Sequence, residues 1–206
     1  FIQFSIGGNM GKVLALVGGV VAGITTPLLP LQLLWLNLLT DGLLGLGLGV
    51  EPAERNVMRR PPVAANAGIF SGGLGAQIVR AGLVIGAVAL AVGLYAYWAG
   101  NPGWQTMLFA TLAFAQVWQA VGIRTGSESI FRAGLFTNLP LLGLAAAVIG
   151  LQLAAIYLPL LQNFLGTSAL RWQDLLLAAA AGSLVFVAAE LEKVWTRRRA
   201  AGKKQG

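Results

Sequence analysis

Three polar side chains lie inside an apolar run, and their types and spacing could bind a cation. Asn37 and Asp41 are four residues apart, so on a helix they would share one face, and Thr40 adjoins Asp41. Oxygen atoms of this kind are the ligands that hard cations prefer. An Asp at the centre of a membrane helix costs about 2.5 to 3.5 kcal/mol on insertion scales, so its position needs a reason.

A second polar pair precedes this run. Asn9 and Lys12 are three residues apart and would also share a helix face. In an antiparallel hairpin, Lys12 and Asp41 would lie about 20 Å and about 16 Å from the turn at 1.5 Å per residue, and therefore at similar depth. The pair is either an ion pair that fixes two helices or an ion site whose charge the lysine tunes. Ionisable residues inside a membrane favour the functional interpretation.

Another apolar segment carries Gln116 and Gln119, again three residues apart. Their carbonyl oxygens could bind a cation, or the side chains could form hydrogen bonds between helices, worth about 0.6 kcal/mol in a membrane. The sequence leaves these alternatives open. Gly42, directly after Asp41, favours either local unwinding that frees backbone carbonyl ligands or simple close packing.

The composition explains what must position these residues. The 206 residues are 57% hydrophobic and only 10% charged, whereas soluble domains carry about 25% charged residues. An integral membrane protein in a lipid bilayer is therefore expected. The chain has no Cys and no His, which excludes disulfides, thiolate metal sites and the commonest general base. The net charge of +7 lies mostly in short connectors and the tail, so we expect no nucleic-acid partner.

Six apolar segments each approach the roughly 20 residues that span a bilayer. The predicted fold is an all-α polytopic membrane protein, a bundle of six transmembrane helices forming one domain over residues 1–206. A basic cytoplasmic tail is expected at 193–206. The predicted spans are 1–24, 28–50, 72–98, 105–123, 139–158 and 172–192.

The distribution of basic residues predicts the orientation. Connectors two and four and the tail hold most of the Arg and Lys residues, whereas connectors one, three and five hold only Arg171. By the positive-inside rule both ends of the chain are expected in the cytoplasm. The Ala-, Gly- and Leu-rich composition without Cys favours a bacterial plasma membrane.

The run from Gln32 to Gly42, QLLWLNLLTDG, closely resembles the sixth transmembrane helix of type II P-type cation ATPases, the family of the sarco/endoplasmic reticulum calcium pump. The flanks agree, because Gly8–Val13 resembles the polar centre of the fifth helix. Glu51-Pro52 and Met58–Pro62 resemble the loop that follows the sixth helix. The resemblance covers the whole chain as helices five to ten and is most specific from Gln32 to Pro62.

This resemblance implies ion ligands at Asn37, Thr40 and Asp41, and at Asn9 on the preceding helix. Where calcium pumps of this family have glutamates, this chain has Lys12 and Gln116, so the more interior of two calcium sites loses its carboxylates. We therefore expect at most one cation site, with Asn37 and Asp41 as metal ligands and Lys12 tuning the charge. Ca2+ is the implied cargo, and H+ or a monovalent ion stays open.

The family's phosphorylated aspartate lies in an Asp-Lys-Thr-Gly motif. Asp41 and Asp174 are the only aspartates, and neither is followed by Lys-Thr-Gly. The chain resembles a fragment with no catalytic residue of its own, so ATP and Mg2+ would act through N-terminal helices and cytoplasmic domains outside it, its expected partners. The alternatives are an independent secondary transporter or channel that uses the Lys12/Asp41 pair, and a non-transporting scaffold. The match from Gln32 to Pro62 favours the pump.

Overall fold

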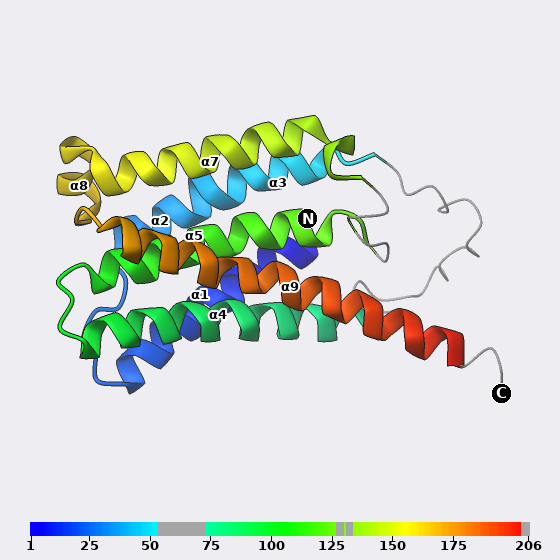
Figure 1. Cartoon of the computed structure of the whole chain (residues 1–206), viewed down its shortest axis with the longest axis horizontal. Coiled ribbons are helices and arrows are strands. Elements are labelled where there is room, and N and C mark those ends of the chain that lie inside the picture. The colour runs from blue at the N-terminus through cyan, green and yellow to red at the C-terminus, as the bar shows by residue number, and fades with distance from the viewer. Residues whose placement is uncertain (53–72, 127–129, 131–133, 203–206) are drawn as a thin grey trace.

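A computed structural model describes residues 1–52, 73–126, 130 and 134–202 (Figure 1). This part of the chain is helical without strands, and six of its helical segments are long and apolar enough to cross a membrane. The predicted all-α bundle of six membrane helices is confirmed, and the chain is a multi-pass integral membrane protein. The six segments are Ile2–Val21, Pro30–Gly49, Leu74–Trp98, Trp104–Ile123, Leu139–Tyr157 and Trp172–Thr196.

The second span consists of three helical pieces in one continuous rod. α2 (Pro30–Trp35) begins with a proline, whose fixed φ suits a first helical turn. A π-helical turn, η1 (Leu36–Thr40), follows and leads into α3 (Asp41–Gly49). Isolated π-helical turns are frequent at functional sites. The irregularity that Gly42 suggested thus lies just before Asp41, because the Asp41 N–H bonds the Leu36 carbonyl five residues back.

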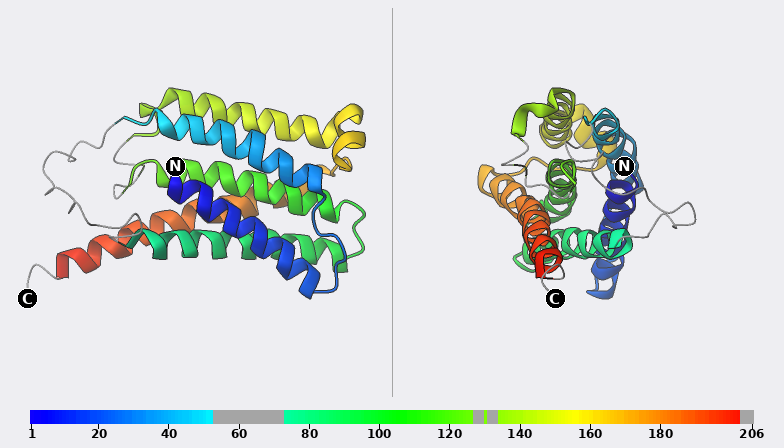
Figure 2. Two further views of the ribbon diagram at one scale, coloured as in Figure 1. Left: turned by 180° about the vertical axis from the view of Figure 1, so that it is seen from behind. Right: turned by 90° about the vertical axis from the view of Figure 1, so that its right-hand side faces the viewer.

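The helix α5 (Trp104–Ile123) lies in the middle of the bundle, between α3 and α7 on one side and α1, α4 and α9 on the other (Figure 2). It packs against α4, α9, α7 and α1, and nearly all of its residues are buried. Gln116 and Gln119 on α5 therefore lie inside the protein and not against lipid.

Close contact between α1 (Ile2–Val21) and α4 (Leu74–Trp98) depends on glycine. A Cβ atom on Gly86 would lie 2.7 Å from Leu14 Cβ and 3.0 Å from the Gly11 carbonyl oxygen. A Cβ atom on Gly82 would lie 2.8 Å from Met10 Cβ. Small residues at such spacing let membrane helices approach closely.

The C-terminal half departs from the predicted boundaries in two places. Residues 159–171, expected as a loop, contain the short helix α8 (Pro159–Leu165), which ends at Gly166 with a left-handed φ of 64°. The last helix, α9 (Trp172–Gly202), continues beyond residue 192, so most of the predicted tail is helical. Before these elements lie α7 (Leu139–Tyr157) and a 3-10 turn, η4 (Leu135–Thr137). Residues 53–72, which include the Met58–Pro62 motif, lie outside the described residues.

Candidate cation-binding site

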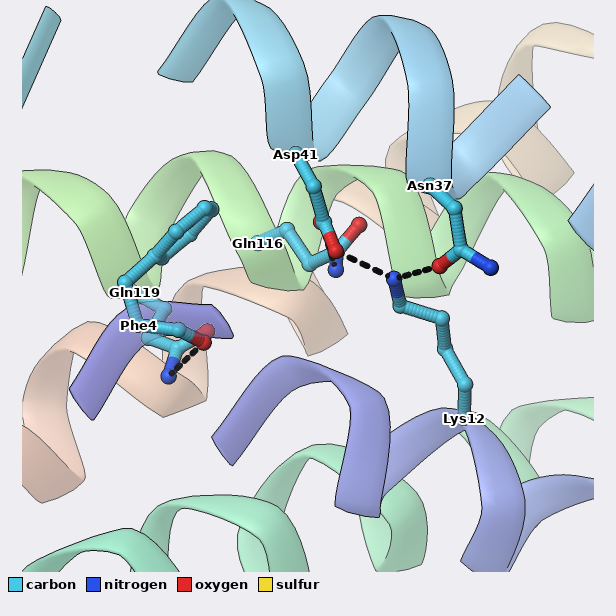
Figure 3. A network of polar contacts seen from close by, with 6 residues as sticks. All are labelled: Phe4, Lys12, Asn37, Asp41, Gln116 and Gln119. Carbon is cyan, nitrogen blue, oxygen red and sulfur yellow. Dashed lines mark hydrogen bonds and ion pairs between the residues drawn. The ribbon is translucent and has the colours of Figure 1, made fainter. Parts of the chain in front are cut away.

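The side-chain ammonium of Lys12 lies between two oxygen atoms of the second span (Figure 3). Lys12 Nζ is 2.7 Å from Asp41 Oδ2 and donates a hydrogen bond of 2.5 Å to Asn37 Oδ1. The meeting of Lys12 and Asp41, expected from their equal depth in a hairpin, is therefore observed. The structure also shows that Asn37 accepts a hydrogen bond from the same ammonium.

The ion pair is almost completely enclosed. Lys12 is 3% exposed and Asp41 is 8% exposed. Two buried charges are tolerated only with good geometry and further hydrogen bonds. Gln116 supplies one, because its Nε2 donates to Asp41 Oδ1 over 2.5 Å. Both oxygens of the Asp41 carboxylate thus have a donor, from α1 on one side and α5 on the other.

The helix α1 makes room for the two glutamines of α5 by means of adjacent glycines. A Cβ atom on Gly7 would lie 2.9 Å from Gln119 Nε2, and a Cβ atom on Gly8 would lie 2.9 Å from Gln116 Nε2. Sequence reasoning missed this pair of glycines, and a Gly-Gly step in an apolar segment is the only signal that could have found it. Gln119 donates a long hydrogen bond of 3.4 Å to the Phe4 carbonyl oxygen.

The remaining predicted ligands divide into an inner and an outer set. Thr40 is buried beside Asp41, with an exposure of 1%. Asn9 and Asn37 are exposed, and Asn9 has no hydrogen-bonding partner among the residues that the structure describes. The structure thus brings Lys12, Asn37, Asp41 and Gln116 into one network and leaves Asn9 outside it.

Each of the two asparagines lies in an exposed apolar stripe of its own helix. Leu34 and Leu38, which flank Asn37 in the sequence, are 54% and 66% exposed. The exposed residues of α1 that share the stripe with Asn9 are Ile6, Val13, Val17 and Val20. Asn9 and Asn37 are therefore polar groups on a face that is otherwise suited to an apolar environment.

Hydrogen bonds anchor both ends of the span that carries Asn37 and Asp41. At its start, Gln32 Oε1 accepts from the Leu29 N–H at 3.1 Å, and Gln32 Nε2 donates to the Leu165 carbonyl at 3.2 Å. At its other end, Asn138 Nδ2 donates to the Gly47 carbonyl at 3.0 Å. The π-helical turn lies between these anchors.

The oxygen atoms at the site belong to a carboxylate, carboxamides and a hydroxyl, and hard cations bind oxygen ligands of this kind. Within the described ranges, no three His, Cys, Asp or Glu side chains gather into a metal-binding group. The only acid of the network, Asp41, is already neutralised by Lys12. A cation at this site would therefore compete with the ammonium for the oxygens of Asn37 and Asp41.

Comparison with known proteins shows the family of this chain. The family described as "Cation transporting ATPase, C-terminus" matches residues 25–195. The chain is similar to a calcium-transporting ATPase of Bacillus subtilis, with 34% identity over 86% of this chain and 20% of the relative. It is also similar to calcium-transporting ATPase type 2C member 2 of the mouse, with 32% identity over 96% of this chain and 21% of the relative.

Calcium-transporting ATPase 1 of Yarrowia lipolytica is 32% identical over 97% of this chain and 22% of its own length. The chain thus spans about a fifth of the length of these relatives, which come from both bacteria and eukaryotes. The match extends through the helices that carry Asn37, Asp41 and Gln116. The chain therefore belongs to the cation-transporting P-type ATPases, of which it forms the C-terminal membrane part.

Proposed function

We propose that the chain forms the ion pathway of an ATP-driven calcium pump and contributes to one cation site, beside Asn37 and Asp41. The observation that carries the proposal is the ammonium of Lys12, which contacts both of these side chains. Ca2+ is the proposed cargo because the curated relatives are named calcium-transporting ATPases.

The fixed positive charge limits the number of ions. A divalent cation 4 Å from the ammonium would be repelled by roughly 8 kcal/mol at an effective dielectric constant of about 20. Such an ion is therefore excluded from the side of Asp41 that Lys12 occupies. The single cation binds on the open side of the network, where Asn37 is exposed. Asn37 Oδ1 and the Asp41 carboxylate then exchange the ammonium of Lys12 for the cation.

The proposal requires partners outside the chain. Asn9 and Asn37 are exposed within an apolar stripe, and a polar group facing lipid is costly unless another group satisfies it. We place further helices of the same pump on this stripe, where they would complete the cation site. The relatives are about five times longer than this chain. We assign the domains that bind ATP and Mg2+ to the parts of the pump outside this chain.

The number of calcium ions transported per ATP in the full pump, reconstituted in vesicles, tests this proposal. The wild type should transport one Ca2+ per ATP, and Lys12→Glu should raise the ratio towards two, because it restores a carboxylate and removes the repelling charge. Lys12→Arg should keep the ratio at one. An unchanged ratio in Lys12→Glu that still transports Ca2+ would contradict the role of the ammonium.

Ion identity is tested on the same preparation. Micromolar Ca2+ should activate ATP hydrolysis by the wild type, whereas Na+ or K+ alone should not. Asp41→Asn should lose Ca2+ activation, and Gly150→Ala should retain it because a Cβ atom there meets no atom within 4 Å. Activation by a monovalent ion in place of Ca2+ would reject calcium as the cargo.

A further inference from the structure

A single buried glutamine fastens the start of the second span to a distant part of the chain. Gln32, in the first turn of α2, is 0% exposed. Its Oε1 accepts from the Leu29 N–H at 3.1 Å, and its Nε2 donates to the Leu165 carbonyl at 3.2 Å. Leu165 is the last residue of α8, and the last carbonyls of a helix have no donor within that helix. Gln32 thus satisfies one backbone group at the start of α2 and another at the end of α8.

The end of α8 also packs against the residues where α2 begins. A Cβ atom on Gly166, which follows α8, would collide with Leu29 Cδ1, so the absence of a side chain there permits the contact. The buried side chain of Leu165 belongs to the same core cluster as Leu28 and Leu36. α2 and α8 lie at the same end of the bundle (Figure 1), and they are joined there by apolar packing as well as by a hydrogen bond.

Backbone hydrogen bonds connect this anchor with the candidate cation site. The Leu36 N–H donates to the Gln32 carbonyl, and the Asp41 N–H donates to the Leu36 carbonyl across the π-helical turn. The backbone of Asp41 is therefore held, through Leu36, on the backbone of Gln32. Asn37 lies about 7.5 Å beyond Gln32 along the helix axis, at 1.5 Å per residue. A rotation or shift of α2 against α8 would therefore move Asn37 and Asp41 relative to Lys12.

We propose that Gln32 is a positioning residue for the candidate cation site. It holds the second span at the height and rotation at which Asn37 and Asp41 meet the ammonium of Lys12, and it does not touch the cation itself. Ligands that are misplaced by about 1 Å bind weakly, so a residue that fixes the supporting helix contributes to affinity. This inference rests on the proposed function, because it treats Asn37 and Asp41 as cation ligands.

The Ca2+ dependence of ATP hydrolysis by the full pump separates positioning from a merely structural role. Gln32→Met keeps the length of the side chain but removes both of its hydrogen bonds. It should raise the free Ca2+ concentration at half-maximal activity by about fivefold or more and change the maximal rate by less than about twofold. The control is Gln105→Met, which removes an exposed hydrogen bond to the Thr26 carbonyl before the same span and should shift neither value. A Gln32→Met pump with the Ca2+ dependence of the wild type would overturn the inference.

A glycine variant disturbs the same contact without removing a polar group. Gly166→Ala places a methyl group against Leu29 and should shift the Ca2+ dependence in the same direction as Gln32→Met. Gly100→Ala, in the turn between α4 and α5, is the matched control. Gly100 has a similar φ of 70°, but a Cβ atom there meets no atom within 4 Å. If Gly166→Ala and Gly100→Ala had the same Ca2+ dependence, the contact between α2 and α8 would have no positioning role.

The structure of the ion-free Gln32→Met pump tests the inference without any transport. Electron cryo-microscopy should show Asn37 Oδ1 beyond hydrogen-bonding distance of Lys12 Nζ, whereas Gln105→Met should keep the 2.5 Å contact. An unchanged contact in Gln32→Met would overturn the inference. A wild-type pump that Ca2+ does not activate would instead reject the proposed function, and the position of Asn37 would still decide the role of Gln32.

Discussion

Lys12 Nζ and Asp41 Oδ2 lie 2.7 Å apart in the interior of the bundle, although 29 residues separate them in the sequence. Each side chain neutralises a charge that neither water nor lipid could stabilise at this depth. Breaking a buried ion pair on one side leaves the other charge without a partner, which typically costs about 3 to 5 kcal/mol. The pair is therefore a structural element as well as part of the proposed ion site.

Lys12→Met should lower the stability of the full pump, because it leaves the Asp41 carboxylate buried with only Gln116 as a donor. The double variant Lys12→Met/Asp41→Asn should regain most of that loss, since neither charge remains. Thermal unfolding of the purified pump in detergent measures both effects. A double variant that is as unstable as Lys12→Met would contradict this account.

Asn37→Ala should weaken Ca2+ activation of the pump by about tenfold or more, equivalent to roughly 1.4 kcal/mol. The reason is that Asn37 is the exposed residue of the network, and its Oδ1, which accepts from Lys12, would accept the cation instead. Leu38→Ala, at the neighbouring exposed position, should change the activation by less than about twofold. Measuring ATP hydrolysis as a function of free Ca2+ gives both values, and equal effects of the two variants would argue against Asn37 as a ligand.

Asn138→Ala should destabilise the pump by about 1 to 3 kcal/mol, because a buried cap of α7 is lost. Asn138 Oδ1 accepts from the Leu141 N–H at 2.8 Å, and its Nδ2 donates to the Gly47 carbonyl and to Glu51. The variant also releases the end of α3. Thermal unfolding measures the loss.

The control for this variant is Asn163→Ala on α8, where the asparagine is exposed. It should leave the unfolding temperature nearly unchanged. If the two alanine variants had equal stability, the anchoring role of Asn138 would be wrong.

Gly86→Ala should destabilise the bundle by about 1 to 3 kcal/mol, because the added methyl group enters the contact between α1 and α4. Gly150→Ala introduces the same change on α7 in open space and should be neutral or slightly stabilising, since Ala favours the helix. Comparing the two variants in one unfolding experiment isolates the packing effect. A Gly86→Ala pump as stable as Gly150→Ala would show that α1 and α4 do not meet closely.

The predicted orientation can be tested with single cysteines, because this chain has none of its own. In a pump without other cysteines, Val50→Cys at the end of α3 should react with an impermeant maleimide from the cytoplasmic side only. Pro102→Cys, in the turn between α4 and α5, should react from the opposite side only. Both positions are exposed. The reverse pattern would invert the proposed topology.

The sequence alone determined the class of the protein and the number of its spans. Membrane helices need about 20 apolar residues to cross a bilayer, and the six runs have that length whatever packs around them. The hairpin also predicted that Lys12 and Asp41 lie at similar depth, because a short connector sets the depth of residues on both of its helices. The sequence did not predict the hydrogen bond from the Leu29 N–H to Gln32 or the short helix α8.

Only the tertiary structure decided how the helices face one another. Periodicity places a side chain on one side of its own helix, but the rotation of a neighbouring helix depends on packing between residues distant in sequence. The structure therefore settled that Gln116 donates to Asp41, and that Gly86, among 28 glycines, lies at a helix contact. It also located the π-helical turn before Asp41, which no pattern in the sequence specifies.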